Sequence, residues 1–343
     1  MTIGDIIGDY RLVTEFASVN CSTGAWAFAE RRNPPSEEMF IKRFMSPKYP
    51  FRGSSGGDAS RQQQLQRCEW FEAQQVAILN ALERVAKNGG SVVGTIDFFR
   101  EAAFYYKVTE KIDSVGLDVK AISALKRDDT MTLLLTLAHT LGELHAERVI
   151  HGDLKPANVL VKRTKDSYAA KVIDFDGSYI EGASPRPESL QGDFPYFSPE
   201  QAAYVVGGGP GGSSLTTASD VFTAGIIFTE YLTGRKPDFD TRRFRYLCEA
   251  VAGGNFPEWP KSPKISEDLR DLVLAMLAAD SRTRPSMKSV HTRLMELNSG
   301  LPRASSTHDR PASHLVGRGF GATPDNTRTA GTQDEIVGKG FGR

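Results

Sequence analysis

Short apolar segments separated by polar breaks fill most of the first 110 residues. The segments are rich in aromatic and β-branched side chains, and Gly, Pro or other polar positions bound them, which is the pattern of β-strands. The predicted strands are residues 10–16, 25–30, 39–44, 91–100 and 102–112. We therefore expect the beginning of the chain to form a small β-sheet.

One longer segment in this region has a helical pattern. Residues 68–86 repeat apolar side chains at helical spacing, and an Asn-Gly-Gly run follows at 88–90, so a helix is predicted. Its apolar positions are Phe71, Val76, Leu79, Leu82 and Val85. The preceding residues, 46–64, are polar and contain Gly and Pro, so they are predicted to form a loop.

The chain after the predicted sheet is mainly helical in pattern. Two segments are strongly apolar, and two segments near the end are amphipathic. The four predicted helices are residues 131–149, 221–234, 266–280 and 287–298. Residues 201–219 have a Gly-rich centre, which predicts a flexible loop.

The composition changes after about residue 301. Residues 301–343 contain few bulky apolar side chains and many Gly, Ser, Thr and Pro residues, so a disordered tail is predicted. The motif Val-Gly-(Arg or Lys)-Gly-Phe-Gly occurs twice in this tail, within residues 315–321 and 336–342. Two explanations stay open: low-complexity drift, or two short motifs that bind a partner with increased avidity.

Charge and cysteine content narrow the classes of function. The 343 residues include 42 Lys and Arg against 42 Asp and Glu, so no net charge favours nucleic acid or an anionic membrane as a partner. The three cysteines have no ligand spacing, which argues for a reducing compartment. Neither a secretion signal nor an apolar run of membrane-spanning length is found. We therefore expect a soluble, cytoplasmic protein without a nucleic-acid or membrane partner.

One polar loop carries side chains suited to phosphate chemistry. Residues 149–161 have apolar flanks and a polar centre with Asp153, Lys155 and Asn158. A carboxylate, an ammonium group and an amide on one tight loop can hold a hydroxyl, a phosphate and Mg²⁺. This loop is the first candidate catalytic element.

The loop sequence H-G-D-L-K-P-A-N, residues 151–158, resembles the H-R-D-L-K-P-x-N catalytic loop of protein kinases. Residues 174–177, D-F-D-G, resemble the kinase D-F-G motif, and residues 192–200 resemble the end of the kinase activation segment. The motifs occur in the family's order. The resemblance implies an α+β, two-lobed protein kinase fold, in which a small antiparallel sheet lobe carries one long helix and the larger lobe is mainly helical. The implied boundaries are 8–300 for the catalytic domain, about 8–110 for the N-lobe and about 114–298 for the C-lobe.

The resemblance assigns roles to the charged residues. Asp153 is expected to orient the acceptor hydroxyl and take its proton, and Lys155 to steady the γ-phosphate of ATP. Asn158 and Asp174 are expected to bind Mg²⁺ through hard oxygen atoms. Lys42 matches the strand lysine that holds the α- and β-phosphates.

In the kinase family, an acid on the long helix pairs with this strand lysine. Glu72 matches that position best because apolar residues and a Leu-Asn end follow it. Glu69, one turn earlier on nearly the same face, is the alternative.

The resemblance also assigns the nucleotide pocket. Thr109 falls at the gatekeeper position, and the backbone of Glu110 and Ile112 is expected to pair with adenine. Asp113 is expected to reach the ribose, and Leu160 to form the apolar floor under the base.

Five positions depart from the family pattern. The glycine-rich loop of the family has three glycines, and only one of them, Gly24, is present here. Phe40 stands where kinases carry an Ala that contacts adenine. Asp176 replaces the Gly of D-F-G. Asp193 replaces a Thr, which predicts a cluster in which Lys155 separates two carboxylates. Gly152 replaces the arginine that pairs with a phosphorylated activation loop, so activity independent of such phosphorylation is predicted.

Three further matches are structural. Glu200 and Arg284 correspond to a buried ion pair, and Asp220 to the aspartate that supports the catalytic loop. These matches favour a protein kinase over small-molecule phosphotransferases, although the H-G-D-L sequence also resembles aminoglycoside and choline kinases.

The favoured function is therefore an ATP- and Mg²⁺-dependent serine/threonine protein kinase that acts on a protein hydroxyl. A pseudokinase that binds partners is the main alternative because the glycine-rich loop, Phe40, Asp176 and Asp193 depart from the family. A small-molecule phosphotransferase is the third possibility.

Overall fold

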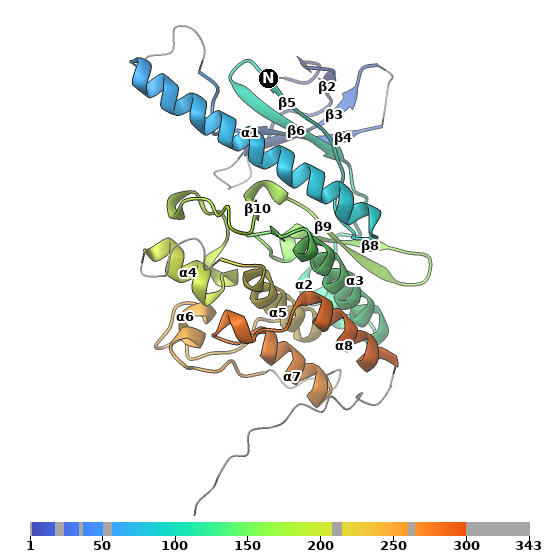
Figure 1. Cartoon of the computed structure of the whole chain (residues 1–343). Helices are drawn as coiled ribbons and strands as arrows, with labels where there is room; N and C mark the ends of the chain where they lie inside the picture. Colours follow the sequence, from blue (N-terminus) through green and yellow to red (C-terminus); the bar gives the residue numbers. More distant parts are fainter. Residues whose placement is uncertain are drawn as a thin grey trace, which may run out of the picture. The chain divides into compact units, whose positions relative to one another are not determined.

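The computed structural model describes residues 2–17, 24–33, 37–50, 57–207, 215–259 and 265–299. The predicted tail with its repeated motif, the part of the glycine-rich loop before Gly24 and the Gly-rich centre of 201–219 lie outside these ranges. Within them, an N-terminal sheet with one long helix is followed by a mainly helical region (Figure 1). This order confirms the predicted α+β class.

The N-terminal sheet has six strands in the order β1-β2-β3-β4-β6-β5, and all neighbours are antiparallel. The strands are β1 (Ile6–Ile7), β2 (Tyr10–Leu12), β3 (Gly24–Arg31), β4 (Met39–Phe44), β5 (Thr95–Glu101) and β6 (Phe104–Glu110). Alternation along β3 and β4 buries Ala27, Ala29 and Ile41 on one face, against Tyr106 and Val108 of β6. The opposite face carries Lys42 toward the helical region.

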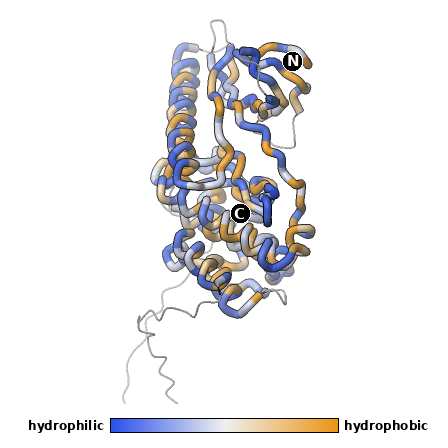
Figure 2. Tube along the Cα trace, turned by 90° about the vertical axis from the view of Figure 1, so that its right-hand side faces the viewer, coloured by the Kyte–Doolittle hydropathy of each residue, from blue (hydrophilic) through white to orange (hydrophobic). Residues whose placement is uncertain are grey.

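The long helix α1 (Asp58–Lys87) packs against the sheet through aromatic contacts such as Phe71 with Phe44. It begins inside the segment 46–64, for which the sequence predicts a loop; the first turns are polar and exposed, so they give no apolar periodicity. Figure 2 shows apolar and polar positions alternating along this helix. Of the predicted apolar residues, Leu82 and Val85 are buried and Phe71 and Leu79 partly buried, whereas Val76 is 50% exposed.

In the part of the second region that the structure describes, seven further helices and two short strand pairs are found. The helices are α2 (Val119–Ala124), α3 (Arg127–Ala146), α4 (Pro199–Val206), α5 (Ala218–Thr233), α6 (Leu247–Ala252), α7 (Glu267–Met276) and α8 (Met287–Ser299), and the strand pairs are β7 (Val149–Ile150) with β10 (Tyr179–Ile180) and β8 (Val159–Arg163) with β9 (Tyr168–Val172). Almost all of α5 is buried, as its apolar sequence predicts. None of the helices in the described ranges is long and apolar enough to cross a lipid bilayer.

A buried ion pair joins α4 to the turn before α8. Arg284 donates to the two carboxylate oxygens of Glu200 at 2.6 and 2.9 Å. Arg284 also donates to the backbone carbonyls of Ala218 and Ala278, so its guanidinium group connects three segments. The predicted pair is confirmed, and its two parallel hydrogen bonds give it a fixed geometry.

Removal of the Arg284 charge should destabilise the protein. Arg284→Met leaves a Glu200 side chain that is 12% exposed without its cation, and breaking a buried pair costs about 3–5 kcal/mol. Urea unfolding should show this loss. Arg282→Met is the matched control, since the Arg282 side chain is 88% exposed and solvent-exposed ion pairs contribute little to stability. Equal losses in both variants would contradict the anchoring role.

Candidate active site

The loop between β7 and β8 is held in place by a buried carboxylate. Asp220, near the start of α5, accepts hydrogen bonds from the backbone N–H groups of His151 at 2.8 Å and Gly152 at 3.2 Å. Nε2 of His145 lies 3.2 Å from the same carboxylate. Burial by itself raises the pKa of Asp220, but His145 and His151 outweigh burial and lower it. Asp220 is therefore ionised and fixes the loop backbone, as predicted.

Lys155 lies between two carboxylates. Its Nζ atom is 3.1 Å from Oδ2 of Asp153 and 3.0 Å from Oδ2 of Asp193. This confirms the predicted cluster. Burial raises the pKa of Asp153 despite the opposing charge of Lys155. The Oδ1 atom of Asp153 is buried and makes no hydrogen bond within the described part of the chain.

Asn158 and Asp174 present oxygen atoms on two adjacent segments. Nδ2 of Asn158 donates to the backbone carbonyl of Asp153 at 2.7 Å, so Oδ1 is the remaining polar atom of this amide. Asp174 follows Ile173, whose carbonyl lies 3.0 Å from Nε2 of His151 in the catalytic loop. An amide oxygen and a partly exposed carboxylate are suitable ligands for Mg²⁺. The donor set therefore fits this ion.

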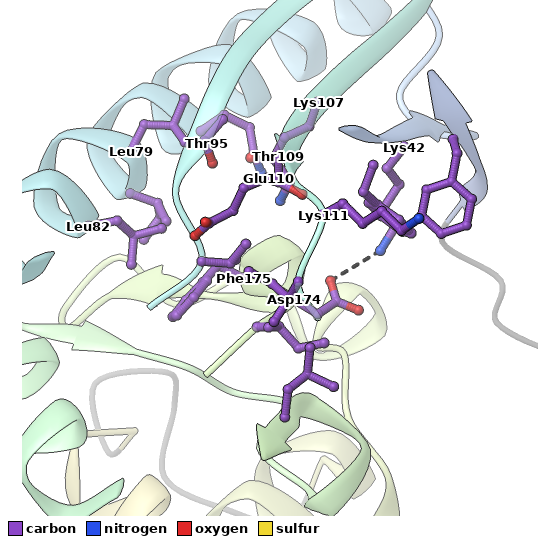
Figure 3. Close-up of a pocket in the computed structure, with 18 residues that line it drawn as sticks. Lys42, Leu79, Leu82, Thr95, Lys107, Thr109, Glu110, Lys111, Asp174 and Phe175 are labelled. Carbon is purple, nitrogen blue, oxygen red and sulfur yellow. Dashed lines mark hydrogen bonds and ion pairs between the residues drawn. The ribbon is translucent and has the colours of Figure 1, made fainter. Parts of the chain in front are cut away.

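A cavity of about 260 Å³ adjoins Asp174. Thr109, Glu110, Ile112 and Leu160 line it, as the resemblance implies for residues around a nucleotide base. Figure 3 shows Leu79 and Leu82 of α1 on one side, and Lys42 and Asp174 on the other. Asp113, in contrast, is exposed and does not line the cavity, so its contact with a ribose stays a prediction.

Aromatic rings form the cavity wall that β3 and β4 contribute. Phe28 and Phe40 are cross-strand partners and both line the cavity. Trp26 stacks on Phe40 with ring centroids 5.5 Å apart. The wall at this position is therefore bulkier than the Ala of the family pattern would provide.

Residues 66–294 match the family model described as protein kinase domain, which is more than half of the chain. The chain belongs to the protein kinase family. Its two-lobed α+β fold is the kinase fold. The matched range contains the catalytic loop and Asp174, whereas Gly24 and Lys42 precede it.

Curated relatives of the chain include bacterial and plant kinases. A probable serine/threonine-protein kinase PknB of Lactococcus lactis is 28% identical over 248 residues, which are 69% of this chain and 35% of the relative. The serine/threonine-protein kinase pkn2 of Myxococcus xanthus is 27% identical over 258 residues, 73% of this chain and 29% of the relative. A calcium and calcium/calmodulin-dependent serine/threonine-protein kinase DMI-3 of Medicago truncatula is 27% identical over 199 residues, 57% of this chain and 36% of the relative. The chain thus spans about a third of the length of these relatives.

The strand lysine of this kinase does not pair with Glu72. The Glu72 carboxylate instead accepts a 2.6 Å hydrogen bond from the hydroxyl of Tyr105, and the alternative, Glu69, is exposed. Lys42 lies 3.1 Å from Asp174 and also forms an ion pair with Asp176. The predicted Lys42–Glu72 pair is wrong because α1 turns a different set of side chains toward the cavity.

Sequence reasoning missed four polar residues that line the cavity, namely Gln75, Thr95, Lys107 and Lys111. Gln75 lies one helical turn after Glu72, on the face that also carries Ile78. Lys107 stands two residues before Thr109, and strand alternation places both on the same face of β6. This spacing could have identified Lys107 from the sequence.

Steric contacts explain why two positions of the site, 24 and 152, carry glycine. A Cβ atom at Gly24 would lie 2.8 Å from the carbonyl oxygen of Arg43 in the neighbouring strand, so the close approach of β3 and β4 requires glycine; its predicted contact with phosphate stays a prediction. Gly152 has φ +79°, and a Cβ atom there would lie 2.9 Å from the Gly177 carbonyl oxygen. The backbone therefore excludes the arginine that other kinases carry at this position.

Proposed function

We propose that the chain is an ATP- and Mg²⁺-dependent serine/threonine protein kinase. The observation that carries this proposal is the 3.1 Å contact between Lys42 and Asp174 at the edge of the cavity. In this contact, Lys42, which is expected to bind phosphate, lies beside Asp174, which is expected to bind the metal ion. Both residues line the cavity proposed for the nucleotide base. The sequence of the catalytic loop, with Lys155 two residues after Asp153, and the names of the relatives favour Ser or Thr as the acceptor.

The side chains would divide the chemistry as follows. Asn158 and Asp174 would hold Mg²⁺, which neutralises phosphate charge during transfer. Lys42 would hold phosphate oxygens. Asp153 would accept the proton of the substrate hydroxyl, and burial, which raises the pKa of its carboxyl group, makes the carboxylate a better base. Lys155 supplies positive charge beside it.

One observation favours a second function, that of a partner-binding pseudokinase. Phe28 and Phe40 narrow the cavity on the side where the family carries a small residue. A protein of this kind would bind nucleotide without transferring phosphate, or would not bind it.

A transfer assay separates these functions. We expect the purified chain, given γ-labelled ATP, Mg²⁺ and dephosphorylated casein as a generic acceptor, to label Ser or Thr. Asp153→Asn removes the proton acceptor, and general-base groups contribute about 10²–10⁴-fold in rate, so a loss in this range is expected. Asp174→Asn should also abolish most of the label. The exposed Asp166→Asn, in the turn after β8, is the matched control. Nucleotide binding without any label on protein would refute the kinase proposal.

The Lys155 cluster should influence the pH dependence of transfer. Asp193 is one of the groups that raise the pKa of Asp153, after burial. Asp193→Thr should therefore lower that pKa and move the acidic limb of the pH–rate profile to lower pH, because Asp153 must be ionised to accept a proton. The Asp193 side chain is 55% exposed, so the rate should fall only about two- to fivefold. An unchanged profile, equal to that of the exposed control Glu188→Gln, would disprove the coupling.

We also propose that phosphorylation of the activation segment does not control activity. Residues after Asp174 are held by contacts that need no phosphate: β10 pairs with β7, Ser178 donates to the His151 carbonyl at 3.0 Å, and Tyr204 donates to the Pro185 carbonyl at 2.8 Å. Ile150, Tyr179 and Leu215 form a buried apolar cluster beside them.

Phosphatase treatment tests this proposal. After dephosphorylation of residues 177–191, verified by mass spectrometry, the chain should keep its full transfer rate. A large loss of rate would show that phosphorylation orders the segment after all.

A further inference from the structure

Two lysines face each other across neighbouring strands at the cavity. Lys42 in β4 and Lys107 in β6 are directly opposite partners in the sheet register. Both line the cavity, and Figure 3 shows their side chains entering it from the two strands. Like charges in this arrangement repel each other and destabilise a sheet. The pair therefore needs a negative charge nearby.

Asp176 supplies that charge from the segment that also carries Asp174. Its carboxylate forms ion pairs with both Lys42 and Lys107, and its side chain is 2% exposed. The Asp176 carboxylate thus bridges the ammonium groups of Lys42 and Lys107.

The long helix offers no acid for this purpose. The residue that α1 places at the cavity beside Ile78 and Leu79 is Gln75, which is buried and uncharged. Glu72, one helical turn earlier, does not line the cavity and accepts a hydrogen bond from the Tyr105 hydroxyl. The helix therefore fills its side of the cavity with an amide and apolar groups.

We propose that Asp176 is the positioning residue for Lys42, in place of an acid on the long helix, and that Lys107 is the second cation that fixes Asp176. The proposal rests on the proposed function in one respect, namely that Lys42 binds nucleotide phosphate. Asp176 lies two residues after the metal-ligand candidate Asp174. The placement of the phosphate-binding cation and that of the metal ligand are therefore coupled through one short segment, and neither requires an ion pair with α1.

A charge-relocation experiment tests this assignment. Asp176→Asn keeps the shape of the side chain but removes the charge, and Asp176→Asn combined with Gln75→Glu moves the carboxylate to the helix position that lines the same cavity. The melting temperature without nucleotide and the affinity for ATP with Mg²⁺ are measured for wild type and for each variant. Asp271→Asn, an exposed aspartate of α7, is the matched control.

Asp176→Asn should lower the melting temperature by about 5–10 °C, because Lys107 loses the Asp176 carboxylate and Lys42 keeps only its contact with Asp174. It should weaken ATP binding about 10- to 100-fold. The double variant should recover most of both losses, whereas Gln75→Glu alone should gain nothing, since the cavity then holds an excess carboxylate. If Asp176 only stabilised its own turn, a carboxylate at position 75 would not restore the melting temperature or the ATP affinity.

Three results would overturn the proposal. They are wild-type behaviour of Asp176→Asn, no recovery in the double variant, and a loss in Glu72→Gln equal to that of Asp176→Asn. If wild type itself does not bind ATP, the proposed function fails, while the melting temperatures without nucleotide still decide whether Asp176 pairs with the lysines.

Discussion

The carboxylate of Asp176 is almost completely withdrawn from water, and such a charge is tolerated only beside opposite charges. The structure meets this constraint with Lys42 and Lys107, which would repel each other as cross-strand neighbours if Asp176 were absent. One ion-pair cluster therefore connects the N-terminal sheet to the segment that carries Asp174. The position of the candidate phosphate-binding cation follows from this cluster.

A second buried carboxylate organises the other half of the site. Asp220 binds two backbone N–H groups of the catalytic loop, so the loop geometry is fixed from a rigid, buried helix. The same loop carries Asp153, Lys155 and Asn158. The left-handed backbone of Gly152 is part of the same arrangement, and it leaves no space for a phosphate-sensing arginine.

Much of this site could be predicted from the sequence because the catalytic residues lie in short, contiguous motifs. The Lys155 cluster was deduced from Asp193, which departs from the family pattern, and the Glu200–Arg284 pair from two positions that match it. Both predictions are confirmed. The partner of Lys42 was not predicted correctly, because the side chains that α1 turns toward the cavity depend on how the helix packs against the sheet. The match to the family pattern selected Glu72, whereas the structure places the uncharged Gln75, one helical turn later, at the cavity.

A double-mutant cycle between Lys42 and Asp176 measures the central interaction most directly. The free energy of unfolding in urea is determined for wild type, Lys42→Met, Asp176→Asn and the double variant, and the same cycle is run for Lys42 with Glu72→Gln. Contacting charged residues give coupling energies of about 0.5–3 kcal/mol. We expect a value of about 1–3 kcal/mol for Lys42 with Asp176 and under about 0.5 kcal/mol for Lys42 with Glu72. The reverse order would contradict the account.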